Sequence, residues 1–391
     1  MNQKTKYYIN SVLWTLVSTV ITGAMFQTFL LEKGIDENRV GQIVSLMQFV
    51  QMAVIMIFSK FIDAVKNVIR VTAASHLLYL PLFPVMAVLC FTAKSGFPLL
   101  VTAAVVACIG AGFYNVLAYK IPYHIMDMKD YGVWTGGSSV VSAIFMLALT
   151  AALSAAQKHF GYFSAMRVFF PLATAGILLF VWMTASYKKV DYPAPANEQK
   201  KVPLLKYRPF TVLILPNFIR GFCAGIVAMA VTVGYAGGQL NADSAGVLLV
   251  ITQTVGIPAN LLYTRHTGRE PTILLLGSVG LFGAVSLIGL FHTTGFLICY
   301  AAAYFCLCLI NVAVPVLVAR IVDYRIVGQY NSWRILLNTA GIFAASLVCM
   351  PIVNTMGTTA VWMIAGAMQL VSGFVYYIYG KRLQTEPAAS A

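Results

Sequence analysis

Long apolar runs separated by short polar breaks make up most of the 391-residue sequence. A bilayer core about 30 Å thick needs about 20 mostly apolar residues per helix. Runs of that length predict twelve membrane-spanning helices, at residues 7–31, 40–62, 70–93, 97–125, 133–156, 162–187, 210–236, 243–264, 271–292, 294–322, 329–353 and 357–380. The first run is too long for the apolar core of a signal peptide, so we expect it to remain as a helix.

The longest polar stretch, residues 187–209, divides the twelve runs into six and six. Its prolines and lysine clusters cannot form a span, and we interpret it as a cytoplasmic linker. We therefore expect an all-α integral membrane protein with an N-terminal six-helix bundle over residues 1–186 and a C-terminal six-helix bundle over residues 210–382. Residues 383–391 form a cytoplasmic tail in this interpretation.

Composition and charge support a membrane location. Hydrophobic residues make up 60% of the chain and charged residues only 10%, against roughly 25% charged in soluble domains. With a cytoplasmic N-terminus, 19 of the 26 Lys and Arg residues fall on the cytoplasmic side and five outside, as the positive-inside rule requires. The net charge of +14 then indicates contact with anionic lipid and not with nucleic acid. We expect a monomer in a bacterial inner membrane, with both termini cytoplasmic.

The sequence contains no motif that is typical of an enzyme or of a metal site. The seven cysteines lie in apolar runs without a C-x-x-C pair, which indicates reduced packing residues. No P-loop, nucleophile elbow or metal-ligand spacing occurs. The sequence therefore predicts no cofactor, no metal and no enzymatic activity.

The two halves repeat weakly. An offset of 193 residues relates the ends of the fourth and tenth spans, in the pairs Pro122 and Pro315, and Asp130 and Asp323. A second offset, of 205 residues, relates the second and eighth spans and pairs Gln48 with Gln253. Shared offsets over helix–loop segments favour repeated bundles, a construction common in transporters.

Twelve helices in two repeated halves, with cytoplasmic termini and a basic linker, resemble the major facilitator superfamily. The signature of that family is a loop G-x-x-x-D-R-x-G-R-R after the second helix. Here the corresponding loop contains Lys60 and Asp63, and the loop after the eighth helix ends in Gly268 and Arg269. The resemblance implies secondary transport, in which the halves rock about a central site, and it implies that Asp63 contacts the start of the eleventh helix at the inner face.

A second resemblance is to the glycoside–pentoside–hexuronide cation symporters. Residues 121–123 (Ile-Pro-Tyr) and 130–136 (Asp-Tyr-Gly-Val-Trp-Thr-Gly) are similar to a stretch of that group. In that group the stretch follows the tenth helix and acidic cation ligands lie in the second. Here it follows the fourth, and the second helix has no acid at mid-depth.

Arg220 is the clearest intramembrane charge. It lies ten residues after Phe210, which places it about 15 Å deep in a helix. A charge at that depth is costly and is a functional hypothesis by default. The planar guanidinium matches a carboxylate or phosphate, so Arg220 predicts an anionic group on the solute. The alternative is that Arg220 bonds helix carbonyls or a neighbour such as Asn217 and locks the bundle.

Neutral polar and aromatic side chains near mid-depth complete the candidate solute site. Besides Arg220 and Asn217, these are Gln48, Gln253, Trp14, Tyr114, Asn115, Asn311 and Asn338. Intramembrane amides need a partner on another helix or on a ligand, and for any one of them helix contact is the competing interpretation. The same applies to Gly221 and Gly225, whose spacing permits close helix packing.

All twelve acids fall in loops, tails or span ends. Proton- and sodium-coupled carriers usually bury a carboxylate, so a coupling proton or sodium ion, exchange and uniport all remain open. His76, in the third span, could carry a proton, but a packing role is the competing interpretation.

The inner ends of the spans carry the charges that we expect to act in gating. They are Lys60, Asp63, Asp127, Asp130, Arg269, Arg320, Asp323 and Arg334. Asp127 and Arg320 differ by the same 193 residues, which predicts a contact between the halves or, equally, local pairs within each half. Arg334 lies near enough to the end of its span to extend to the interface.

The sequence thus predicts a secondary transporter of a small polar, anionic organic solute, working by alternating access as a symporter or antiporter. Three alternatives stay open: an efflux carrier for amphipathic drugs, a sugar–cation symporter, and a lipid-handling or signalling protein that keeps the fold.

Overall fold

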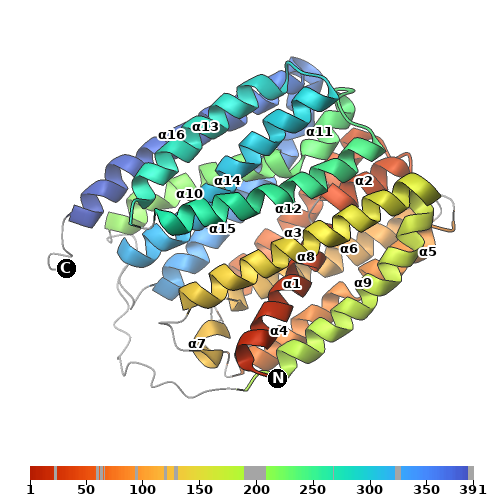
Figure 1. The fold of residues 1–391 in the computed structure, drawn as a ribbon, viewed down its shortest axis with the longest axis horizontal. Helices are drawn as coiled ribbons and strands as arrows, with labels where there is room; N and C mark the ends of the chain where they lie inside the picture. The colour runs from red at the N-terminus through yellow and green to blue at the C-terminus, as the bar shows by residue number, and fades with distance from the viewer. Residues whose placement is uncertain are drawn as a thin grey trace. The chain divides into compact units, whose positions relative to one another are not determined.

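The fold is described from a computed structural model of the chain, which covers residues 1–21, 24–58, 61, 65, 67–92, 96–118, 121–126, 131–188, 208–266, 268–321 and 327–385. Every regular element within these residues is a helix (Figure 1). The chain forms two compact units, Met1–Pro195 with Asn241–Thr254, and Ala196–Leu240 with Val255–Ala391.

Besides the first part of α12 (Ala242–Arg265), the described residues of the first unit form ten helical elements. They are α1 (Gln3–Ile21), α2 (Ala24–Glu32), α3 (Glu37–Phe58), α4 (Val68–His76), the 3-10 helix η2 (Leu77–Tyr79), α5 (Leu82–Leu89), α6 (Phe97–Leu117), α7 (Ile121–Ile125), α8 (Tyr131–Phe160) and α9 (Tyr162–Ala185). Helix α1 packs against α8 and α9, α3 packs against α6, and α4 lies between α6 and α9.

Besides the last part of α12, the described residues of the second unit form six helices. They are α10 (Arg208–Ala228), α11 (Ala230–Ala236), α13 (Glu270–Ile288), α14 (Thr293–Ile321), α15 (Val327–Met356) and α16 (Thr358–Thr385). Helix α10 packs against α15 and α16, and α13 packs against α14 and α16. Helix α12 (Ala242–Arg265) begins in the first unit and ends in the second.

The predicted spans correspond to these helices. Among the described residues, ten helical segments are long and apolar enough to cross a membrane. An eleventh consists of Leu215–Ala228 and Ala230–Ala236, which meet at a bend of 52°. Helix α12, of which several side chains lie outside the described residues, covers the remaining predicted span, 243–264.

Two spans are shorter or less regular than predicted. The span expected at 97–125 ends as α6 at Leu117, and α7 is a separate short helix. The span expected at 70–93 changes from α4 to the 3-10 segment η2 and then to α5. Pro81 precedes α5 and has no backbone N–H to continue an α-helical ladder.

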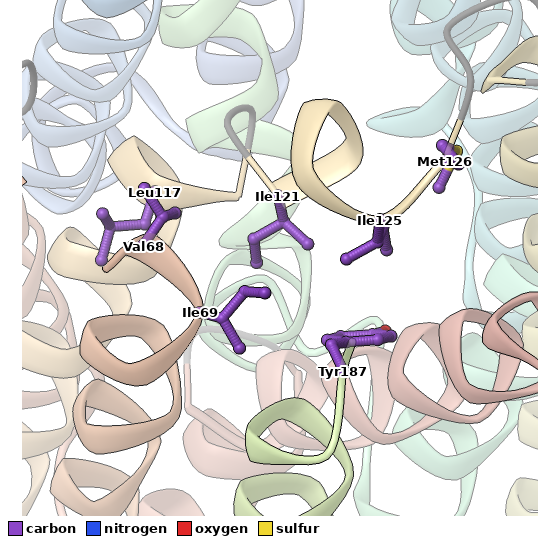
Figure 2. Close-up of a cluster of buried hydrophobic side chains, with 7 residues drawn as sticks. All are labelled: Val68, Ile69, Leu117, Ile121, Ile125, Met126 and Tyr187. Atoms are coloured by element: carbon purple, nitrogen blue, oxygen red, sulfur yellow. The ribbon is translucent and has the colours of Figure 1, made fainter. Parts of the chain in front are cut away.

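A cluster of buried apolar side chains joins the ends of several helices in the first unit. It consists of Val68, Ile69, Leu117, Ile121, Ile125, Met126 and Tyr187. In Figure 2, Ile121 and Ile125 of α7 point toward Ile69 of α4 and Tyr187 beyond α9. The short helix α7 is therefore held by side-chain burial, because five residues are too few for a stable helix on their own.

Candidate functional site

Arg220 is the centre of a polar cluster in the second unit. Its side chain is 7% exposed. Arg220 lies more than three turns after the start of α10. The Nη1 group donates to Oδ1 of Asn311 at 3.1 Å, and Nη2 donates to Oδ1 of Asn338 at 3.0 Å. The structure thus brings together three of the predicted residues, from α10, α14 and α15.

Glycines allow this cluster to form, because they bring the α10 and α15 backbones close together. A Cβ added at Gly221 would lie 2.8 Å from Cα of Asn338 and closer still to the carbonyl oxygen of that residue. A Cβ at Gly341 would lie 2.6 Å from the backbone nitrogen of Phe222. Optimal carbon contacts are about 3.5–4.0 Å, so a larger residue at either position would push the helices apart. The predicted role of Gly221 in close packing is confirmed.

Asn311 and Asn338 differ in their exposure. Asn311 is exposed, whereas Asn338 is half-buried. The guanidinium of Arg220 is therefore buried, but one of its partners reaches the surface of the unit.

Arg334 and Tyr376 lie beside this cluster. Arg334 is one turn before Asn338 on α15 and is 3% exposed; its extension to the membrane interface stays a prediction. Tyr376 of α16 is fully buried and lies within electrostatic reach of both Arg220 and Arg334. Asn217, one turn before Arg220, is also fully buried.

Tyr376 was missed in the sequence, although α16 carries a usable signal. Gln369, Ser372 and Tyr376 follow one another at i, i+3 and i+7 in an otherwise apolar helix, and all three are fully buried. Gln369 donates to the hydroxyl of Ser278 at 3.0 Å, and Ser372 donates to the carbonyl of Pro216 at 3.2 Å. A polar stripe with this spacing marks the face by which α16 packs on α13 and α10.

A second cluster, in the first unit, is aromatic. The rings of Trp14 and Tyr114 have centroids 4.0 Å apart, and both side chains are half-buried. Behind them Tyr79 and His76 are fully buried. The partly exposed rings of Trp14 and Tyr114 offer a face on which a planar or ring-shaped group could stack.

The remaining candidates of the first unit do not join this contact. Asn115 follows Tyr114 on α6 and is half-buried. Gln48 is 6% exposed on α3, which packs against α6. The predicted Gln pair stays a prediction, because the side chain of Gln253 lies outside the described residues.

Most of the expected gating charges also lie outside the described residues. They are Lys60, Asp63, Asp127, Asp130 and Asp323, together with the side chain of Arg320. Arg269 is described; it is exposed and occupies the position just before α13, where its side chain makes no capping hydrogen bond. The proposed gate contacts therefore stay predictions.

Glu270 is the first residue of α13, at a span end as predicted, and its side chain is fully buried. Its Oε1 atom accepts a hydrogen bond from the hydroxyl of Tyr263 at 3.2 Å and another from the backbone N–H of Gly268 at 2.9 Å. Gly268 has a φ of +97°, a conformation that favours glycine. Glu270 therefore holds the turn that connects α12 to α13.

The described part of the chain contains neither a candidate metal site nor a disulfide bond. No group of three or more His, Cys, Asp or Glu residues there could hold a metal ion. The seven cysteines are free thiols, and five of them are buried.

Comparison with known proteins gives a consistent result. The model of the Major Facilitator Superfamily matches residues 8–307. A D-xylose–proton symporter has a similar structure, with a TM-score of 0.68, 14% identity and 95% coverage of each chain. The nucleoside transporter NupG has a TM-score of 0.64 at 11% identity and covers 97% of this chain and 100% of its own. The fucose–proton symporter FucP of E. coli has a TM-score of 0.61 at 11% identity, with 98% and 97% coverage. No curated protein sequence matches the chain.

Proposed function

The chain belongs to the Major Facilitator Superfamily, and from this membership we propose that it moves a small polar, anionic organic solute across the membrane by alternating access. The fold is that of multi-pass membrane transporters. The nature of the solute is inferred from the chain's own residues.

The observation that carries the proposal is the hydrogen bonding of Arg220. Its two terminal nitrogens donate to neutral amide oxygens of Asn311 and Asn338. A carboxylate or phosphate adds the Coulombic attraction of a negative charge, which a neutral amide oxygen lacks, and it can accept from both nitrogens at once. A solute anion can therefore compete with the amides for the guanidinium.

A neutral sugar or related solute is the second candidate. The half-buried pair of Trp14 and Tyr114 favours it, since aromatic faces suit ring-shaped ligands. Two of the similar structures are named as sugar–proton symporters. In this case Arg220 would lock α10 to α14 and α15.

We propose a proton as the coupling ion, because two similar structures are named as proton symporters. The Lys and Arg distribution supports an orientation with both termini cytoplasmic, and we place the carrier in the plasma membrane. In this proposal residues 1–186 and 210–382 are the two bundles, residues 187–209 link them, and the carrier is a monomer without enzymatic activity.

A stability screen separates the two candidates. The purified carrier is heated with pairs of matched solutes that differ in one group: carboxylates against their amides, and sugar phosphates against the free sugars. A ligand at 100 times its Kd stabilises the folded state by about 2.7 kcal/mol. Anionic members alone should raise the Tm.

The variants Arg220→Lys and Arg220→Gln then test whether stabilisation by an anionic solute depends on Arg220. Lysine keeps the charge but loses the two-pronged geometry, so stabilisation should be reduced with Lys and lost with Gln. Arg39→Gln is the matched control, because Arg39 forms an exposed ion pair with Asp36 at the start of α3. Stabilisation by neutral sugars that survives Arg220→Gln would favour the second candidate.

A further inference from the structure

His76 is a buried polar group for which the packing of the first unit provides no hydrogen bond. It is the last residue of α4 and is 0% exposed. Neither Nδ1 nor Nε2 has a hydrogen-bond partner within the described residues. A neutral imidazole carries one donor and one acceptor, and buried polar groups in native proteins are nearly always hydrogen-bonded. The arrangement therefore calls for an explanation beyond packing.

Aromatic rings surround the imidazole. The ring of His76 stacks on Phe180 with centroids 3.8 Å apart and an interplanar angle of 17°. The centroid of Tyr114 is 5.2 Å away and that of Tyr79 is 5.7 Å away. A cation within about 6 Å of aromatic faces is attracted by the ring quadrupoles. The aromatic faces therefore attract an imidazolium, while burial of the ring favours its neutral form, so protonation requires water to reach the site.

The titratable groups that face this cluster are few. Tyr79 comes from η2, and Tyr114 and Cys108 come from α6. Helices α1 and α9 contribute Trp14 and Phe180, which do not titrate. The carboxylate side chains that the structure describes are Glu32, Asp36, Glu37 and Glu270, and none belongs to α1, α4, η2, α6 or α9. Lys4 and Lys6 of α1 and Arg167 of α9 lie near helix ends; Lys6 and Arg167 bond the carbonyls of Ser186 and Cys90.

The backbone changes its helix type next to this imidazole. Helix α4 ends at His76, and the chain continues as the 3-10 segment Leu77–Tyr79 before α5. A 3-10 stretch within a span often marks a functional hinge. Gly110 of α6 packs on this segment, since an added Cβ would lie 2.9 Å from the carbonyl oxygen of Ser75 and from Cε1 of Tyr79. A small rearrangement at η2 would therefore change the surroundings of His76.

We propose that His76 is the proton-binding site of this carrier. When the rearrangement at η2 admits water, the unprotonated ring nitrogen accepts one proton from the aqueous phase and one N–H bond forms. The same bond breaks when the site faces the other side, so one proton crosses in each cycle with no change in oxidation state. The inference rests on the proposed transport function and adds the residue that couples it to protons.

The aromatic pair gives this site a connection to the solute. Tyr114 contacts both His76 and Trp14, and Trp14 and Tyr114 are partly exposed. A solute group stacked on these two rings would lie one ring away from the imidazole. Binding of the solute and protonation of His76 would then be coupled through Tyr114.

Nitrogen NMR tests the protonation directly and needs no solute. The chain has five histidines, and the other four, His124, His159, His266 and His292, are half-buried or exposed. A variant with these four replaced by Gln, labelled with ¹⁵N-histidine and placed in lipid nanodiscs, reports His76 alone. The matched sample is His76→Phe with the other four retained.

The expected result is a neutral imidazole signal joined by an imidazolium signal as the pH falls from 8.5 to 5, with full reversal. A signal that stays neutral over the whole range would overturn the proposal. Because no solute is present, a negative result here leaves the transport function standing, and failure of the solute screen leaves this measurement unaffected.

A transport assay adds the consequence for coupling. For one proton per solute, a gradient of one pH unit drives about tenfold accumulation of the radiolabelled solute identified by the stability screen. In proteoliposomes we expect that accumulation with the wild type and with His159→Gln, which removes an exposed histidine of α8 outside this cluster. With His76→Phe the ratio of inside to outside solute should fall to one. Wild-type accumulation by His76→Phe would contradict the proposal.

Discussion

Gly221→Ala should damage both the packing of the second unit and its solute site. The added methyl would lie 2.8 Å from Cα of Asn338 and closer to the carbonyl oxygen of that residue. The shortfall from an optimal carbon contact is about 1 Å. Backbone atoms of α15 cannot rotate away as a side chain can, so α10 and α15 must separate.

The expected cost follows from that geometry. Overpacking a well-packed interior by one carbon typically costs about 1–3 kcal/mol, and contacts between small residues are a main source of helix association in membranes. For a unit of about 150–250 residues, each kcal/mol lowers the Tm by about 2–4 °C. Because Asn338 accepts from Arg220, the same displacement should weaken the binding of an anionic solute.

Gly283→Ala is the matched control, because Gly283 lies in α13 of the same unit and an added Cβ meets no atom within 4 Å. Alanine is favoured over glycine in a helix by about 1 kcal/mol, so this variant should be as stable as the wild type or more so. Thermal unfolding of both variants in the same lipid or detergent makes the comparison. Equal stability of Gly221→Ala and Gly283→Ala would refute the packing argument.

Three further substitutions test other parts of the account. Asn10→Ala removes hydrogen bonds from α1 to the hydroxyls of Thr184 and Tyr187, and we expect a loss of about 1 kcal/mol in thermal unfolding; no loss would mean that these bonds are not needed. Glu270→Ala should destabilise the turn before α13 by about 1–3 kcal/mol and increase its proteolysis, while Glu270→Gln keeps an acceptor and should lose less; equal effects would contradict the hydrogen-bonding role. Trp14→Ala should weaken binding of ring-containing solutes more than Trp14→Phe does, as measured by Tm shifts, and equal weakening would exclude stacking.

The sequence predicted the helices well because apolar length alone defines a span. It did not predict where spans break. The run at 97–125 was predicted as one span, yet α6 ends at Leu117 and a second helix, α7, begins at Ile121. The stability of α7 comes from contacts with Ile69 and Tyr187 (Figure 2), and these residues lie 52 and 66 positions away from Ile121. Local periodicity carries no information about such contacts.

In the candidate site, too, local sequence predicted some features, and contacts between distant residues determined the others. The depth of Arg220 could be counted along one helix, but its partners could not, because Asn311 and Asn338 are 91 and 118 residues away. Asn311 and Asn338 were each chosen separately, because each is a polar residue in an apolar run. Tyr376 was overlooked because tyrosine is common in membrane helices, and only its spacing from Gln369 on α16 distinguishes it.

The central claim is that Arg220 binds the anionic group of the solute, and solute exchange in proteoliposomes tests it most directly. Vesicles loaded with the unlabelled anion that stabilises the carrier are diluted into the labelled form, and uptake is followed for the wild type, Arg220→Lys, Arg220→Ala and Arg39→Gln. The account predicts wild-type exchange for Arg39→Gln, reduced exchange for Arg220→Lys and none for Arg220→Ala. Exchange by a folded Arg220→Ala carrier at the wild-type rate would contradict it.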